Sequence, residues 1–144
     1  MLTDRLIKDI YEQNRTIVVY GMSTDPEKPA HMVPKFLMSK GFDIVPINPR
    51  EDSIIDRKCY PGLRDVEENI GILNVFRPSD QALNVVQEAI TRKQDRGDIN
   101  VIWLQEGIEN ENARRLAEQA GILFIQDMCI KKEFMRIFNE TENT

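Results

Sequence analysis

Short apolar runs alternate with longer amphipathic segments along almost the whole chain. Five of these runs are only four or five residues long and rich in β-branched side chains, which is typical of strands buried in a parallel sheet. They cover residues 17–20, 43–47, 72–76, 101–104 and 122–125. Apolar residues at helical spacing predict helices in the remaining segments, which follow Thr3, cover 30–40, follow Ser79 as N-cap, cover 110–119 and cover 131–138.

The alternation of strand and helix predicts an α/β fold. We expect a single Rossmann-type domain, with a parallel five-stranded sheet and helices on both faces, because parallel strands need crossover helices between them. This domain should cover residues 1–138, and the polar segment 139–144 should form a disordered tail.

Two segments depart from the regular pattern. Pro34 falls inside a predicted helix, where proline is tolerated only near the first turn. Residues 50–69 lose all periodicity and contain a turn signal at 60–62. We expect a loop or a short helix there, anchored in the core by Leu63 and Val66.

The composition of the chain excludes several classes of function. Nineteen Lys and Arg against 24 Asp and Glu give a net charge of -5, which leaves no basic footprint for nucleic acid. No segment approaches the roughly 18 apolar residues that a membrane span needs. Cys59 and Cys129 form no C-x-x-C pair and predict neither a disulfide framework nor a metal site. We therefore expect a cytoplasmic protein that binds a small molecule.

Polar residues follow each predicted strand, at the edge where ligands bind in open parallel sheets. These segments are Gly21 to Pro29, Asn48 to Arg50, Arg77 to Ser79, Gln105 to Gly107 and Asp127 to Cys129. The first of them joins a strand to a helix, so helix N–H groups and the positive end of the helix dipole favour a phosphate there. Ser23 and Pro26 stand where a G-x-G-x-x-G motif has glycines, which weakens ordinary dinucleotide binding. Arg50, instead of an acidic residue, follows the second strand and suits a phosphorylated ribose.

Several short motifs resemble those of the small, stand-alone CoA-binding proteins of bacteria and archaea. The motifs are G-M-S with K-P five residues later, V-P-I-N-P-R, N-V-F-R, W-L-Q-E-G and Q-D-M-C, and they span nearly the whole chain. The same fold forms the N-terminal domain of the succinyl-CoA synthetase α subunit, and E-G-I at 106–108 is similar to its T-E-G-I segment.

The resemblance implies coenzyme A, or an acyl-CoA, as the ligand. It implies that Gly21, Met22 and Ser23 cradle the pyrophosphate, that Arg50 meets the ribose phosphate, and that residues 76–79 border the nucleotide. Independently of the resemblance, the other strand ends complete the expected site, where Cys129 stands either near the bound thiol or as a small buried hydrophobic residue. The cofactor-binding residues expected on these two grounds are Gly21, Met22, Ser23, Lys28, Pro29, His31, Asn48, Pro49, Arg50, Phe76, Arg77, Ser79, Gln105, Glu106, Gly107 and Cys129.

No catalytic constellation is evident in the sequence. The histidine that the synthetase phosphorylates belongs to a later domain, and His31 is the single histidine here, with no evident carboxylate or nucleophile partner. We therefore favour a CoA-binding protein over an enzyme. The alternatives are an NADP(H)-dependent small oxidoreductase or redox sensor, and a CoA-binding subunit that serves a separate acyl-CoA ligase partner. Apolar residues on the terminal helices would also allow a homodimer.

Overall fold

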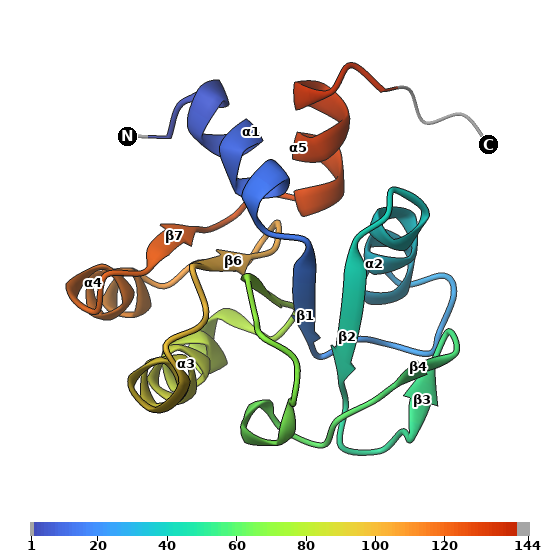
Figure 1. Ribbon diagram of the computed structural model, residues 1–144, viewed down its shortest axis with the longest axis horizontal. Helices are drawn as coiled ribbons and strands as arrows, with labels where there is room; N and C mark the ends of the chain where they lie inside the picture. The colour runs from blue at the N-terminus through green and yellow to red at the C-terminus, as the bar shows by residue number, and fades with distance from the viewer. Residues whose placement is uncertain (1, 141–144) are drawn as a thin grey trace.

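A five-stranded parallel sheet forms the centre of the computed structural model, which describes residues 2–140 (Figure 1). Its strands are β1 (Thr16–Tyr20), β2 (Asp43–Ile47), β5 (Ile72–Val75), β6 (Val101–Leu104) and β7 (Leu123–Ile125). The spatial order is β2-β1-β5-β6-β7, and every neighbouring pair is parallel. The predicted α/β class is confirmed, and the strand positions agree with the apolar runs to within a residue.

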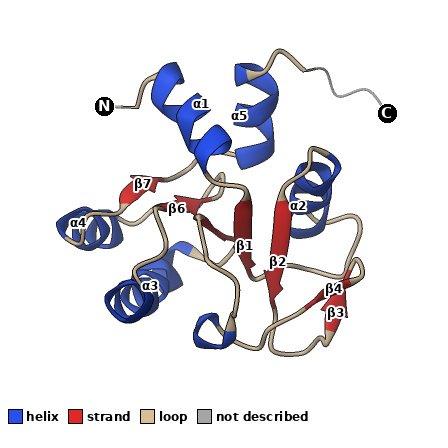
Figure 2. Ribbon diagram, viewed as in Figure 1, coloured by secondary structure: helices blue, strands red, loops and turns tan. Residues whose placement is uncertain are grey.

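Helices cover both faces of the sheet, as expected. One face carries α1 (Asp4–Gln13), α2 (Pro29–Ser39) and α5 (Ile130–Ile137), and the other carries α3 (Ala82–Arg96) and α4 (Glu111–Gln119) (Figure 2). Successive residues of a strand therefore enter different cores: Val19 packs with the first set of helices and Val18 with the second. Burial on both faces explains why the strands read as continuous apolar runs.

Residues 50–69, which lack periodicity in the sequence, hold only small elements. An antiparallel hairpin joins β3 (Ser53–Ile54) to β4 (Arg57–Lys58), and a single 3-10 turn, η1, follows at Leu63–Asp65. Leu63 and Val66 are buried, so the predicted anchors are confirmed.

The predicted capping role of Ser79 is wrong. A 3-10 turn, η2 (Ser79–Gln81), precedes α3, whose N-cap is Gln81 without a side-chain capping bond. Because Ser79 lies a turn too early to reach the N–H groups of α3, its hydroxyl accepts a hydrogen bond from the Glu109 N–H instead (3.1 Å). Ser79 thus ties the start of α3 to the loop that follows β6.

Both ends of the described chain contact the rest of the fold. Glu140, within the tail predicted at 139–144, forms an ion pair with Lys40 (2.9 Å), whereas residues 141–144 lie outside the described part of the chain. Apolar faces of the terminal helices pack on each other, with the Tyr11 ring against Phe134 and Phe138. Within residues 2–140, no helix has the length and apolar character needed to cross a membrane.

A buried guanidinium fastens the irregular segment to α3. The Arg92 side chain, 4% exposed, forms an ion pair with Asp98, 1% exposed, at 3.0 Å. Its remaining N–H groups donate to the backbone carbonyls of Leu63, Val66 and Glu68 at 2.8 to 3.0 Å. These carbonyls belong to no strand, and Arg92 supplies hydrogen bonds that the sheet does not provide to this segment.

Replacing Arg92 should therefore destabilise the fold strongly. We expect Arg92→Met to lower the free energy of unfolding by about 3 to 5 kcal/mol, because it leaves the Asp98 charge buried and unpaired. Urea denaturation measures the loss. The control Arg5→Met removes an 85% exposed arginine paired with Asp9 on α1, and it should cost less than about 0.5 kcal/mol. Equal losses for the two variants would contradict this role of Arg92.

Candidate functional site

The chain reverses its direction of winding between β1 and β5. From β1 it crosses to β2 at one edge of the sheet, and it then returns to the opposite side of β1 to form β5. The loops after β1 and β5 consequently leave the sheet side by side and diverge toward different faces. This point is called the topological switch point, and in open parallel sheets it forms the crevice in which ligands bind.

Gly21 forms the turn at this crevice. Its φ of +94° is a conformation that glycine adopts without the steric cost of a side chain. A Cβ at this position would lie 3.0 Å from Cδ of Arg77 and 3.2 Å from the carbonyl oxygen of Phe76. The Gly21 N–H donates to the carbonyl of Ile47 on β2 (3.0 Å). Glycine is thus required here both by the backbone conformation and by the close approach of the loop after β5.

The loop after Gly21 is pinned through Ser23. Pro34 lies in the second turn of α2, just beyond the first turn in which proline is usually tolerated. The residue at position 34 would normally donate to the Ala30 carbonyl, but proline has no N–H. The Ala30 carbonyl accepts a hydrogen bond from the Ser23 N–H instead (3.2 Å). The carbonyl of Ser23 lies 2.8 Å from Nδ1 of His31, which is the donor of this bond. His31 therefore holds the loop rather than standing alone as a polar group.

The contact between Ser23 and His31 orients the backbone N–H of Thr24. The C=O and N–H of a trans peptide point in opposite directions, so a Ser23 carbonyl directed at His31 leaves the Thr24 N–H facing away from α2. Within residues 2–140, the N–H groups of Met22 and Thr24 have no protein acceptor. Two unpaired N–H donors in the turn at the switch point are suited to bind an anion.

Asn48, after β2, connects the first two loops. Its Nδ2 donates to the carbonyl of Met22 (2.9 Å), and its Oδ1 accepts from the Arg50 N–H (2.9 Å). The carbonyl of Asn48 accepts from the thiol of Cys59 (3.4 Å), and burial raises the pKa of that thiol. Asn48 thus sets the position of Arg50 relative to the turn at Gly21.

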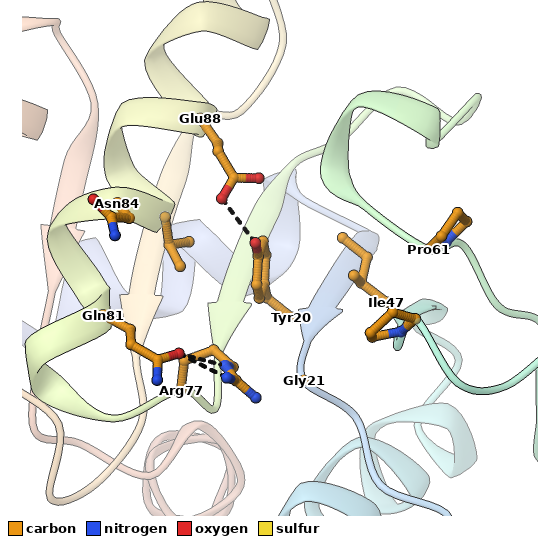
Figure 3. Close-up of a pocket in the computed structure, with 10 residues that line it drawn as sticks. Tyr20, Gly21, Ile47, Pro61, Arg77, Gln81, Asn84 and Glu88 are labelled. Carbon is orange, nitrogen blue, oxygen red and sulfur yellow. Dashed lines mark hydrogen bonds between the residues drawn. The ribbon is translucent and has the colours of Figure 1, made fainter.

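A cavity of about 360 Å³ opens at the switch point (Figure 3). Three expected site residues, Gly21, Pro49 and Arg77, line it together. The other lining residues were not predicted as site residues: Tyr20, Ile47, Pro61, Gln81, Asn84, Val85 and Glu88. In Figure 3 Asn84 and Glu88 of α3, with its N-cap residue Gln81, lie on one side, Ile47 and Pro61 lie on the other, and Tyr20 lies between.

The two ends of the cavity carry opposite charges. At one end, Nε and Nη2 of Arg77 both donate to Oε1 of Gln81 (2.9 and 2.7 Å), and no carboxylate within residues 2–140 pairs with this arginine. At the other end, the Tyr20 hydroxyl donates to Oε2 of Glu88 (2.8 Å). Burial, and then the hydrogen bond and charge of Glu88, raise the pKa of Tyr20 to about 12, so this hydroxyl remains a donor at neutral pH.

Other expected site residues lie outside the cavity. Met22 is fully buried and packs in the core, whereas Lys28, Pro29 and Arg50 are exposed. Phe76 is half-buried and its N–H donates to the Tyr20 carbonyl (2.9 Å).

The residues after β6 and β7 form a neighbouring group. Oε1 of the buried Gln105 accepts from the Ile130 N–H (3.2 Å), next to the buried Cys129. Glu106 forms an ion pair with Lys132 (3.0 Å), and the Gly107 N–H donates to Oδ1 of Asp127 (2.7 Å). In the part of the chain that the structure describes, no cluster of three His, Cys, Asp or Glu side chains could hold a metal ion.

Comparison with known proteins identifies relatives over most of the chain. It is 35% identical over 125 residues to the uncharacterized protein YneT of Bacillus subtilis. This match covers 87% of this chain and 89% of YneT. A solved structure from Thermus thermophilus is 30% identical, with a TM-score of 0.88, and the match covers 95% of this chain and 100% of that one.

The chain is also similar to part of a ligase. It is 25% identical over 126 residues to an ADP-forming acetate–CoA ligase of Archaeoglobus fulgidus, a match that covers 86% of this chain but only 18% of the ligase. A family model described as a CoA binding domain matches residues 15–135, which include the switch point and every residue that lines the cavity. The chain therefore belongs to the CoA-binding domain family.

Proposed function

We propose that this chain binds coenzyme A or an acyl-CoA reversibly, with the pyrophosphate at the first βα turn, over Gly21 to Ser23. The observation that carries the proposal is the cavity at the switch point, which opens beside Gly21 in a member of the CoA-binding domain family. The proposal concerns binding and includes no catalytic step.

The turn supplies the donors that a pyrophosphate needs. The N–H groups of Met22 and Thr24 are unpaired within the described residues, and the Arg77 guanidinium lies close to Gly21. A net charge of -5 does not oppose this, because backbone donors and one nearby cation act locally. The pinned loop holds these donors in place before the ligand arrives, which lowers the entropic cost of binding.

Arg50 is the proposed contact of the ribose phosphate. It is exposed, and within residues 2–140 no carboxylate pairs with its guanidinium. Asn48 fixes its backbone N–H, so the side chain starts from a defined position beside the turn. Lys28, at the start of α2, offers a second cation.

The remaining site residues are proposed to contact the other parts of the ligand. Residues 76–79, with Phe76 and Ser79, border the nucleotide. The loops after β6 and β7 would take the pantetheine chain, with Gln105, Glu106 and Gly107 along it and Cys129 near the thiol. Both loops leave the same edge of the sheet as Gly21, since all five strands are parallel.

A second candidate function is that of a CoA-binding part that serves an acyl-CoA ligase. It is favoured by the match to one region of the Archaeoglobus fulgidus ligase, of which this chain covers only 18%. Co-purification of a ligase subunit with the tagged chain would support this candidate, and recovery of the chain alone would count against it.

Binding can be measured by calorimetry on ligand-free protein. We expect CoA to bind with one site per chain and more tightly than dephospho-CoA or NADP. Arg50→Ala should reduce the preference for CoA over dephospho-CoA about five- to tenfold, because it removes a charge-assisted hydrogen bond to the phosphate. Arg5→Ala, on α1, should leave that preference unchanged. Absence of CoA binding, or tighter binding of NADP, would refute the proposal.

The turn at Gly21 can be tested with a pair of glycine variants. Gly21 and Gly97 both have positive φ values, +94° and +76°, but a Cβ at Gly97 would have no neighbour within 4 Å. Each Gly→Ala change should cost about 1 kcal/mol of stability through backbone strain, and Gly21→Ala should cost more because its Cβ also crowds Phe76 and Arg77. Only Gly21→Ala should weaken CoA binding, by more than about tenfold, because its Cβ displaces Phe76 and Arg77. Equal CoA affinity in both variants would contradict a site at this turn.

A further inference from the structure

The cavity at the switch point has a polarity that would orient a nucleotide within it. Arg77 lies at the end next to Gly21, and Glu88 lies at the other end on α3. Gln81, the N-cap residue of α3, precedes Glu88 by seven residues, so the two lie roughly 10 Å apart along the helix axis. A phosphate is attracted to the first end and repelled from the second.

The Glu88 carboxylate is arranged as an acceptor. Oε2 accepts a hydrogen bond from the Tyr20 hydroxyl, while Oε1 has no hydrogen-bond partner among residues 2–140. Among the described residues, no lysine or arginine forms an ion pair with Glu88. An ionised carboxylate only accepts hydrogen bonds, so the group of the ligand that it meets must carry an N–H or O–H.

The walls between the two ends suit a flat ring. They consist of the Tyr20 side chain, the side chains of Val85 and Ile47, and two proline rings, Pro49 and Pro61. Figure 3 shows Tyr20 between α3 and the side that carries Ile47 and Pro61. Apolar and aromatic surfaces pack well against the faces of a nucleobase.

We propose that Glu88, held by Tyr20, recognises the exocyclic amino group of adenine. This inference rests on the proposed binding of CoA and adds the residue that reads its base. The Oε1 atom of Glu88 accepts an N–H of the amino group, and the Asn84 amide beside it provides a donor for a ring nitrogen. A base with oxygen in place of the amino group turns an acceptor toward the carboxylate and is rejected.

The test compares CoA with its deaminated analogue, in which hypoxanthine replaces adenine. Calorimetry on the wild type should show CoA binding at least about fivefold more tightly, the contribution of one hydrogen bond to a charged acceptor. In Glu88→Gln the two ligands should bind within about twofold of each other, because the amide can also donate to the hypoxanthine oxygen. Thermal unfolding verifies that this variant, altered at an exposed side chain, remains folded.

Two further variants separate recognition from structure. Glu12→Gln makes the same chemical change at an exposed position on α1 and should keep the wild-type preference. Tyr20→Phe removes the hydroxyl that holds the Glu88 carboxylate and should reduce the preference for CoA without abolishing it. Equal binding of CoA and the analogue by the wild type, or an undiminished preference in Glu88→Gln, overturns this inference while CoA binding itself stands. Failure of the wild type to bind CoA would overturn the proposed function and this inference with it.

Discussion

The close approach of three strand ends at Gly21 is the constraint on which the site depends. The Gly21 N–H bonds to Ile47 of β2, and the Phe76 N–H bonds to Tyr20 of β1. A side chain at Gly21 would collide with Phe76 and Arg77. Because this contact holds the ends of β2, β1 and β5 together, the cavity forms between loops whose positions are set by the sheet.

The loop beyond Gly21 is ordered by hydrogen bonds rather than by packing alone. Ser23 is held at its N–H by Ala30 and at its carbonyl by His31, and Asn48 holds the carbonyl of Met22. The bond from His31 to the Ser23 carbonyl leaves the Thr24 N–H facing away from α2, and the N–H groups of Met22 and Thr24 have no acceptor among residues 2–140. A loop prepared in this way can bind an anion in a chain whose overall charge is negative.

The sequence predicted the fold, whereas only three of the residues that line the cavity were among the expected site residues, and this contrast has a physical cause. Strands and helices follow from local periodicity, and Gly21, Pro49 and Arg77 follow strand ends that a parallel sheet brings to one edge. The wall formed by α3 could not be predicted this way, since Tyr20 and Glu88 are 68 residues apart and meet only when the helix packs. The burial of Arg92 could not be predicted either, because the backbone carbonyls that it contacts belong to an irregular segment.

The roles of Pro34 and Ser79 also show the limit of local rules. Proline in the second turn of α2 is unfavourable for an isolated helix, yet here the Ala30 carbonyl binds Ser23. Ser79 precedes a helix as a capping residue would, but its hydroxyl accepts a hydrogen bond from the Glu109 N–H. In both cases a contact with a distant loop decides the outcome.

The central claim is that the turn at Gly21 to Thr24 holds the pyrophosphate of CoA. An NMR titration of isotopically labelled protein with CoA would test it most directly, because each backbone N–H reports separately. The account predicts the largest chemical-shift changes at the amides of Met22 and Thr24. Saturable binding of CoA that leaves these two amides unchanged would contradict it.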